Sequence, residues 1–324
     1  MTTDVIASAT ERLHGRVIRT PLQQSRPLTE RLGLEVLLKL ENLQHTGSFK
    51  ARGAFNKLLT IDPASRCEGI IAASSGNHGA AVAWCARELG TAATIFVPEG
   101  ASAAKIDRIR SYGAVVRFQG IDGLDTEIFA RAEARQSGVA YVSPYNDEAV
   151  VAGQGTVGVE LVEQDSQLDA VFIAVGGGGL IGGVGAWLRD RAPNVRLIGA
   201  VPANSPVMAS SVRAGRILEM ESHPTLSDGT AGGIESDSMT FALCQEVVDD
   251  WVVVPEDEIG RVLREFVIDH DMPIEGAAAV AVAAAIALAP AADWRRIGIV
   301  ICGGNIAAGT LATVMNTEQR REPG

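Results

Sequence analysis

The chain alternates between short apolar segments and longer helical segments, and this alternation most constrains how it can fold. Eight short apolar segments bounded by turn-forming residues predict buried β-strands: 36–40, 69–73, 93–98, 114–118, 170–175, 195–201, 251–254 and 297–302. Helices are predicted between many of them, at 79–89, 103–112, 125–136, 155–163 and 257–269. Such alternation is typical of an α/β protein with mostly parallel sheets covered on both faces.

The length and composition allow a large buried core and argue against two classes of partner. A chain of 324 residues permits one large domain or two ordinary ones, and 47% of its residues are hydrophobic. The formal net charge of −11 argues against nucleic-acid binding, which requires a basic patch. It also disfavours binding to anionic membrane surfaces. We therefore expect neither nucleic acid nor membrane as a partner.

Cysteine spacing and the N-terminal sequence predict a cytoplasmic protein. The four cysteines are widely spread and none has zinc-type or redox-type spacing; they are Cys67, Cys85, Cys244 and Cys302. The first residues lack the basic and apolar regions of a signal peptide. The most apolar stretch, 276–290, is shorter than the roughly 20 residues that span a bilayer. We interpret this stretch as a buried helix and the cysteines as free thiols.

Four consecutive glycines, Gly176 to Gly179, follow the predicted strand 170–175 and precede a helix that begins near Leu180. Glycines let consecutive backbone N–H groups approach an anion, and the helix N-terminus favours negative charge. A tight turn alone would need fewer glycines. Residues 177–182 also match a dinucleotide-binding pattern, which requires a carboxylate at the end of the next strand. Residues 199–204 contain none, so a lone phosphate fits better.

Two further segments complement the glycine run. Lys50 stands among small residues in 46–54, a predicted turn, and a lysine withdrawn from water becomes a nucleophile. Asn77 lies in the loop 74–79, where capping of the next helix is the ordinary alternative. A lysine can form a Schiff base with an aldehyde, a glycine run can hold a phosphate, and an asparagine can bond a ring hydroxyl. Pyridoxal phosphate carries all three groups.

These segments resemble those of the fold-type II pyridoxal-phosphate enzymes, most closely the threonine/serine dehydratase and serine racemase branch. The resemblance covers nearly the whole chain. It implies a tryptophan synthase β-like fold with two open, mostly parallel sheets and flanking helices. It also implies a large domain from residues 1–52 and 147–324, a small inserted domain from 53–146, and a homodimer.

The resemblance also implies the roles of individual residues. Lys50 would hold pyridoxal 5′-phosphate as a Schiff base and Phe49 would pack against the cofactor ring. The other cofactor-binding positions are Asn77 at the 3′-oxygen, Gly176, Gly177, Gly178, Gly179 and Leu180 at the phosphate, and Cys302 facing the pyridine nitrogen. A small buried hydrophobe is an equally common role for a cysteine. Glu275 matches a carboxylate near the ring, although it could also be a helix-start charge.

Substrate binding is implied for the loop that contains Asn77. Its predicted contacts are Ser74, Ser75, Gly76 and His78. Ser75 matches the position that, in racemase-like members, exchanges a proton on the face opposite the lysine, so we place it with Lys50 in the catalytic set. We expect His78 to be a neutral, structural histidine and therefore leave it out of the catalytic set.

Two departures from the family pattern bear on specificity. Racemase-like members hold a divalent cation with carboxylates at positions that here are Val201 and Val207, so we expect no metal. The glycine-rich segment 227–234 lies where relatives build a substrate wall, which predicts a pocket roomy enough for β-hydroxy amino acids larger than threonine.

The predicted function is that of a pyridoxal-phosphate carbon–oxygen lyase. It would convert a β-hydroxy-α-amino acid, L-threonine or L-serine by default, to a 2-oxo acid and ammonia by α,β-elimination. Alternatives are an amino-acid racemase that uses Ser75, or a dehydratase for 3-hydroxyaspartate, phenylserine or a hydroxyectoine-derived compound. Hydroxyaspartate would need a cation such as Arg131 or Arg135. An alternative of another class is a non-catalytic protein that binds a phosphorylated metabolite.

Overall fold

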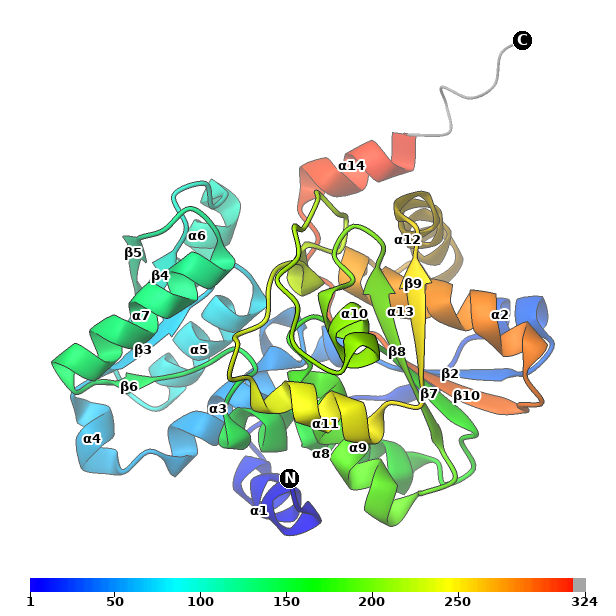
Figure 1. Cartoon of the computed structure of the whole chain (residues 1–324), viewed down its shortest axis with the longest axis horizontal. Helices are drawn as coiled ribbons and strands as arrows, with labels where there is room; N and C mark the ends of the chain where they lie inside the picture. Colours follow the sequence, from blue (N-terminus) through cyan, green and yellow to red (C-terminus); the bar gives the residue numbers. More distant parts are fainter. Residues whose placement is uncertain (317–324) are drawn as a thin grey trace.

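The computed structural model describes residues 1–316, which form two β-sheets that lie side by side among helices (Figure 1). The six-stranded sheet has the order β1-β2-β10-β7-β8-β9 and the four-stranded sheet the order β5-β4-β3-β6. Neighbouring strands run parallel, except that β1 pairs antiparallel with β2. The predicted α/β class with two open, mostly parallel sheets is therefore confirmed.

The bounds of the elements are as follows. The strands are β1 Leu22–Gln24, β2 Glu35–Lys39, β3 Ile70–Ala73, β4 Ala93–Val97, β5 Val115–Phe118, β6 Ala140–Tyr141, β7 Ala170–Ala174, β8 Arg196–Pro202, β9 Asp250–Val254 and β10 Arg296–Val300. The α-helices are α1 Thr3–Leu13, α2 Arg26–Leu32, α3 Lys50–Thr60, α4 Pro63–Cys67, α5 Asn77–Glu88, α6 Ala103–Ser111, α7 Gly123–Ser137, α8 Glu148–Gln164, α9 Gly179–Arg191, α10 Val207–Ala214, α11 Met239–Val247, α12 Glu256–His270, α13 Gly276–Leu288 and α14 Ala308–Asn316. Short 3-10 turns are η1 Glu41–Leu43, η2 His45–Gly47, η3 Asp228–Thr230 and η4 Ala289–Ala291.

All eight predicted strands are present, with ends that differ from the prediction by no more than two residues. The strands β1 and β6 were not predicted, because three and two residues are too short to carry a periodic pattern. The helix predicted at 155–163 begins earlier, at Glu148. The Asp147 carboxylate accepts hydrogen bonds from the N–H groups of Ala149 and Val150 at its start and so caps it.

The core of the large sheet is formed by strands buried on both faces. Every residue of β7 is buried, as expected for a central parallel strand. Helix α13 packs on one side of the sheet and α8 and α9 lie on the other (Figure 1). Helices α8 and α9 touch closely, because a Cβ atom on Gly183 would lie 2.3 Å from the Val151 carbonyl oxygen. The predicted buried helix at 276–290 is confirmed as α13, which ends at Leu288.

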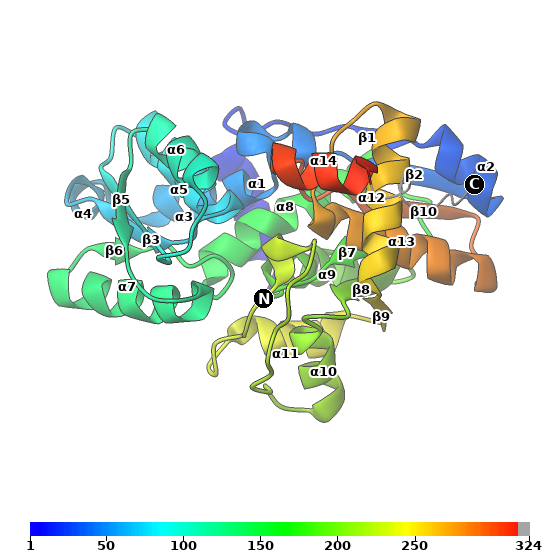
Figure 2. The same cartoon turned by 90° about the horizontal axis from the view of Figure 1, so that it is seen from above.

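The small sheet is sandwiched between helices, and alternate residues of its strands face opposite sides. On β3, Ile70 and Ala72 belong to the apolar cluster that contains α5, whereas Ile71 and Ala73 pack with α7. Figure 2 shows α7 on one side of this sheet and α5 and α6 on the other. All four strands fall within 53–146, and the domain boundaries themselves stay a prediction.

Within residues 1–316, no helix has both the length and the hydropathy needed to cross a bilayer. Helix α13 is the most apolar of the described helices, but it has only 13 residues. It packs against the large sheet.

Candidate active site

A cavity of about 430 Å³ lies where residues of the two sheets meet. The strands β3, β7 and β10 all point their carboxyl ends toward it, the usual position of a ligand in parallel α/β sheets. Every site residue predicted from the sequence lines this cavity: Phe49, Lys50, Ser74, Ser75, Gly76, Asn77, His78, Gly176, Gly177, Gly178, Gly179, Leu180 and Cys302. The structure thus brings together Phe49 and Cys302, which lie 253 positions apart in the chain.

The sequence predicted a turn at Lys50 because its neighbours are small. Lys50 is instead the first residue of α3. The chain before it is attached to the end of β10, where Ser48 forms a bridge with Gly303 and the Phe49 N–H donates to the Cys302 carbonyl oxygen at 3.1 Å. The Lys50 amine donates to the Pro144 carbonyl oxygen at 2.8 Å. Burial lowers the pKa of this amine to about 8.

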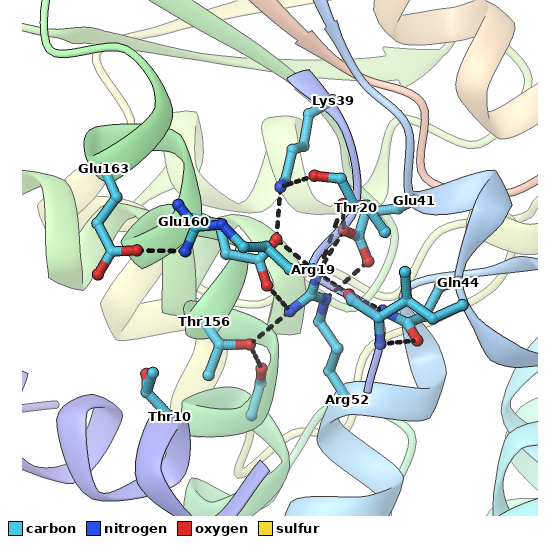
Figure 3. Close-up of polar contacts among 12 residues, drawn as sticks. Thr10, Arg19, Thr20, Lys39, Glu41, Gln44, Arg52, Thr156, Glu160 and Glu163 are labelled. Atoms are coloured by element: carbon cyan, nitrogen blue, oxygen red, sulfur yellow. Dashed lines mark hydrogen bonds and ion pairs between the residues drawn. The ribbon is translucent and has the colours of Figure 1, made fainter. Parts of the chain in front are cut away.

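A buried network of ion pairs fixes helix α3 two residues after Lys50 (Figure 3). The Arg52 guanidinium is fully buried and donates to Glu41 at 2.8 Å and to Glu160 at 2.7 Å. Lys39, also fully buried, pairs with Glu160 at 2.5 Å, and the Thr20 hydroxyl donates to Glu41. Two cations thus meet two carboxylates, which compensates the burial of all four charges.

The glycine run forms the turn between β7 and α9. Gly178 has a φ of 82°, a left-handed conformation that favours glycine, and a Cβ atom there would lie 2.8 Å from the Cys244 sulfur. The carbonyl of Gly177 accepts a hydrogen bond of 2.6 Å from the Thr240 hydroxyl. Helix α9 begins at Gly179, so the unpaired N–H groups of its first turn and its positive dipole end lie at the cavity.

The loop after β3 brings the start of α5 to the same cavity. Its backbone is tight, because the Gly76 N–H donates to the Ser74 hydroxyl at 3.1 Å. The Asn77 amide is held on both sides: its nitrogen donates to the Glu275 carboxylate at 2.8 and 3.0 Å, and its oxygen accepts from Asn305 at 2.6 Å. The first N–H groups of α5 therefore lie at the cavity next to a fixed amide, and such a helix start suits a second anion.

Cys302 and Glu275 form a buried pair on the cavity wall, with the sulfur 3.7 Å from a carboxylate oxygen. Burial raises the pKa of both groups. The thiol is therefore protonated at neutral pH and presents no charge to the cavity.

His78 is buried, and its Nε2 lies 2.9 Å from the Val142 carbonyl oxygen. Burial lowers its pKa to about 3, and the nearby Lys50 amine adds to the effect. The imidazole is therefore neutral at physiological pH and must donate its Nε2–H to that carbonyl, as a structural histidine does. At the positions considered for a metal, Val201 and Val207 are buried and apolar. Among residues 1–316, no group of three or more His, Cys, Asp or Glu side chains is arranged to hold a metal ion.

A polar cluster lies beside the cavity on the side of the small sheet, and of its residues the sequence singled out only Arg131. Glu235 accepts hydrogen bonds from Arg131 at 2.5 Å and from the Asn146 amide, and its N–H donates to the Tyr145 hydroxyl at 3.0 Å. Glu127, on α7, lines the cavity. No local motif marks these residues, because they come from separate segments and meet only in the fold.

The cavity fits a phosphorylated aldehyde. A glycine turn at a helix N-terminus suits a phosphate, and an amine of lowered pKa that has only a carbonyl oxygen as its hydrogen-bond partner suits condensation with an aldehyde. A second helix N-terminus, at α5, leaves a position for a carboxylate. Two mostly parallel sheets with these groups at the carboxyl ends of their strands are typical of an α/β enzyme that uses a phosphorylated aldehyde as its cofactor.

Comparison with known proteins identifies the family. The family described as pyridoxal-phosphate dependent enzyme matches residues 13–303, and the chain belongs to it. The chain is 39% identical over 316 residues to an L-threonine ammonia-lyase of Thermotoga maritima, covering 98% of this chain and 78% of the relative. It is 39% identical over 303 residues to an L-threo-3-hydroxyaspartate ammonia-lyase of a Pseudomonas species, covering 94% of each. The structure of maize serine racemase matches with a TM-score of 0.90 at 30% identity, covering 98% of both chains.

Proposed function

We propose that the protein is an ammonia-lyase that converts a β-hydroxy-α-amino acid to a 2-oxo acid and ammonia, with L-threonine or L-serine as the default substrate. The observation that carries this proposal is that the Lys50 amine, whose pKa is lowered, lines the same cavity as the glycine turn. The names of the relatives support the same reaction class. Because ammonia is released, the net reaction is classed by its carbon–nitrogen bond rather than as a carbon–oxygen lyase.

In this proposal the residues of the large sheet hold the cofactor. The N–H groups of Gly176 to Gly179 and Leu180 would bind its phosphate, and Lys50 would carry its aldehyde carbon covalently. Asn77 would bond the ring hydroxyl, held in orientation by Glu275 and Asn305. The neutral Cys302 thiol would face the ring nitrogen without a charge. When bound, pyridoxal phosphate condenses with amino groups and withdraws electrons from the substrate Cα.

The remaining residues would bind the substrate and move protons. The substrate carboxylate would lie at the N-terminus of α5, against Ser74, Ser75 and Gly76. His78 lies behind this loop and would support it rather than exchange a proton. Lys50, once displaced by the substrate amine, would take the Cα proton, because an amine whose pKa is near 8 is a usable base at neutral pH.

A panel of β-hydroxy amino acids, scored for 2-oxo acid, ammonia and chirality of the remaining substrate, tests this proposal. L-threonine or L-serine should yield equimolar 2-oxo acid and ammonia. Formation of D-serine in excess of pyruvate would favour a racemase with Ser75 as the second acid/base. Ligand binding without ammonia release from any member of the panel would favour a non-catalytic binding protein.

We further propose a cytoplasmic homodimer with a small domain at 53–146 inserted between 1–52 and 147–324. The four cysteines, all free, support a reducing compartment. Light scattering on the purified protein should give twice the mass of one chain, and a single-chain mass would contradict the dimer.

A further inference from the structure

One carboxylate in the cavity has a buried oxygen that forms no hydrogen bond with the described residues. Glu127 projects from α7 into the cavity wall, and its Oε2 atom is buried without any hydrogen bond. A buried polar oxygen without a partner is rare in folded proteins and carries a desolvation cost that a ligand can remove. The site already described uses no part of this side chain.

The charged groups around Glu127 cannot supply that partner. Arg131, the nearest guanidinium on α7, is paired with Glu235 at 2.5 Å and stacks over the Tyr141 ring at 4.9 Å. The Lys50 amine donates to a backbone carbonyl and is assigned to the cofactor. Burial, together with the neighbouring Glu235 carboxylate, raises the pKa of Glu127 to about 8, so Glu127 is ionised at neutral pH only when a cation faces it. Because Arg131 is paired with Glu235, an ionised Glu127 has no cation of its own among these three groups.

Another segment of the cavity wall offers space and no cation that is free of a partner. Residues 229–233, with the sequence Gly-Thr-Ala-Gly-Gly, line the cavity and place backbone and small side chains there. At its edge, Lys105 is paired with Asp228 at 2.5 Å. A substrate side chain longer than that of threonine would therefore extend between a small-residue wall and the Glu127 carboxylate.

We propose that Glu127 is a specificity-determining residue that binds a cationic or N–H-donating group at the end of the substrate side chain. The preferred substrate is then a β-hydroxy-α-amino acid that carries an amine on its γ-carbon or close to it. This inference rests on the proposed function for the position of the substrate. The inference adds the chemistry of the distal group of the substrate. An ammonium there would supply both the hydrogen-bond donor and the positive counter-charge that the Glu127 carboxylate lacks.

The same geometry disfavours a substrate with a second carboxylate. Arg131 and Arg135 were the candidate cations for 3-hydroxyaspartate, but Arg131 is paired with Glu235 and Arg135 is exposed on α7 and does not line the cavity. A distal carboxylate would face the Glu127 carboxylate, and neither Arg131 nor Arg135 lines the cavity to compensate it. In this proposal the chain would differ in substrate preference from the L-threo-3-hydroxyaspartate ammonia-lyase of the Pseudomonas species.

Three substrate analogues without a β-hydroxyl test the proposal by binding alone. L-2,4-diaminobutyrate, L-2-aminobutyrate and L-aspartate differ in the distal group and cannot lose water, so calorimetric titration of the protein loaded with pyridoxal phosphate measures their affinities. Diaminobutyrate should bind about tenfold or more tightly than aminobutyrate, as a charged hydrogen bond provides. Aspartate should bind more weakly than aminobutyrate.

The variant Glu127→Gln keeps the shape and removes the charge, and the advantage of diaminobutyrate over aminobutyrate should fall to within about twofold. The second variant, Glu127→Asp, keeps the charge and should retain a preference for diaminobutyrate. Glu133→Gln, on the same helix outside the cavity, is the matched control and should leave the wild-type ratio unchanged. Cofactor absorbance in each variant confirms a folded, loaded site.

An unchanged ratio in Glu127→Gln, or tighter binding of aspartate than of aminobutyrate by the wild type, would overturn the proposal. Failure of the proposed function has a different signature, since no β-hydroxy amino acid would then release ammonia whatever the affinities of the three analogues. Ammonia release from L-threonine together with equal affinity for the three analogues would overturn the role of Glu127 alone.

Discussion

Removal of the Arg52 guanidinium should destabilise the protein far more than removal of any exposed arginine. The guanidinium is fully buried and is the charge partner of Glu41, which without it keeps only the hydrogen bond from Thr20. Breaking a buried pair on one side costs about 3–5 kcal/mol. For a chain of 324 residues, an unfolding entropy of about 2.1 cal/mol/K per residue converts this loss to a Tm decrease of about 4–7 °C.

The Arg52→Ala variant is measured by urea unfolding and by thermal unfolding, followed by circular dichroism. Arg26→Ala is the matched control, because Arg26 pairs with Glu30 on the surface with 89% and 65% of their side chains exposed. Its loss should stay within about 0.5 kcal/mol. Adding Glu41→Gln to Arg52→Ala should recover part of the stability, because it removes the uncompensated charge. A loss below about 1 kcal/mol in Arg52→Ala would refute the reasoning.

The stability difference between the wild type and Arg52→Ala should depend on pH through Glu160. Burial acts to raise the pKa of this carboxyl, but the charges of Arg52 and Lys39 outweigh burial and lower it. A depressed folded pKa contributes stability that is present above the unfolded value, about 4.3, and is lost as the pH falls through the folded value. The stability difference between wild type and Arg52→Ala should therefore narrow at acidic pH.

Three further predictions concern the cavity. The Gly178→Ala substitution places a side chain on a left-handed backbone and close to Cys244. It should weaken pyridoxal-phosphate binding about tenfold or more in an absorbance titration. An unchanged Kd would contradict phosphate binding by the glycine turn. The rate of cofactor capture by the apoprotein should rise with pH around a midpoint near 8, since only the neutral Lys50 amine reacts; a midpoint near 10.4, the value of an ordinary lysine, in stopped-flow absorbance would contradict the desolvation. β-Hydroxy amino acids with an uncharged side chain larger than that of threonine should have kcat/KM values comparable to that of threonine, because 229–233 leaves room. A steep fall for every larger uncharged side chain would contradict this expectation.

The strands were predictable because strands buried on both faces consist of consecutive apolar residues. The segments 93–98 and 170–175 read directly as β4 and β7. Helix starts were less clear. The first turns of α8 contain glycines and valines, so the sequence pattern predicted too late a start for this helix. The Asp147 cap defines its actual start. Lys50 was placed in a turn because of its small neighbours, whereas the contact of 46–49 with the end of β10 lets the helix begin there.

The site was predictable where its chemistry lies in contiguous residues. The runs 46–54, 74–79 and 176–179 each contain their own turn or helix start, and all three reach the cavity. Glu127 and the Arg131–Glu235 pair were beyond local reading, because their meaning depends on residues about a hundred positions apart in the chain. Arg131 alone reads as a free cation, and only the fold assigns it a partner.

The most direct test of the account is to locate the lysine that carries the cofactor. Borohydride reduction of the protein loaded with pyridoxal phosphate fixes the cofactor to the amine that holds it, and tryptic mass mapping then finds it. The account predicts a modified peptide of residues 40–52, because trypsin cannot cleave after an altered Lys50. An unmodified 40–50 peptide, with the cofactor on another lysine or on none, would contradict it.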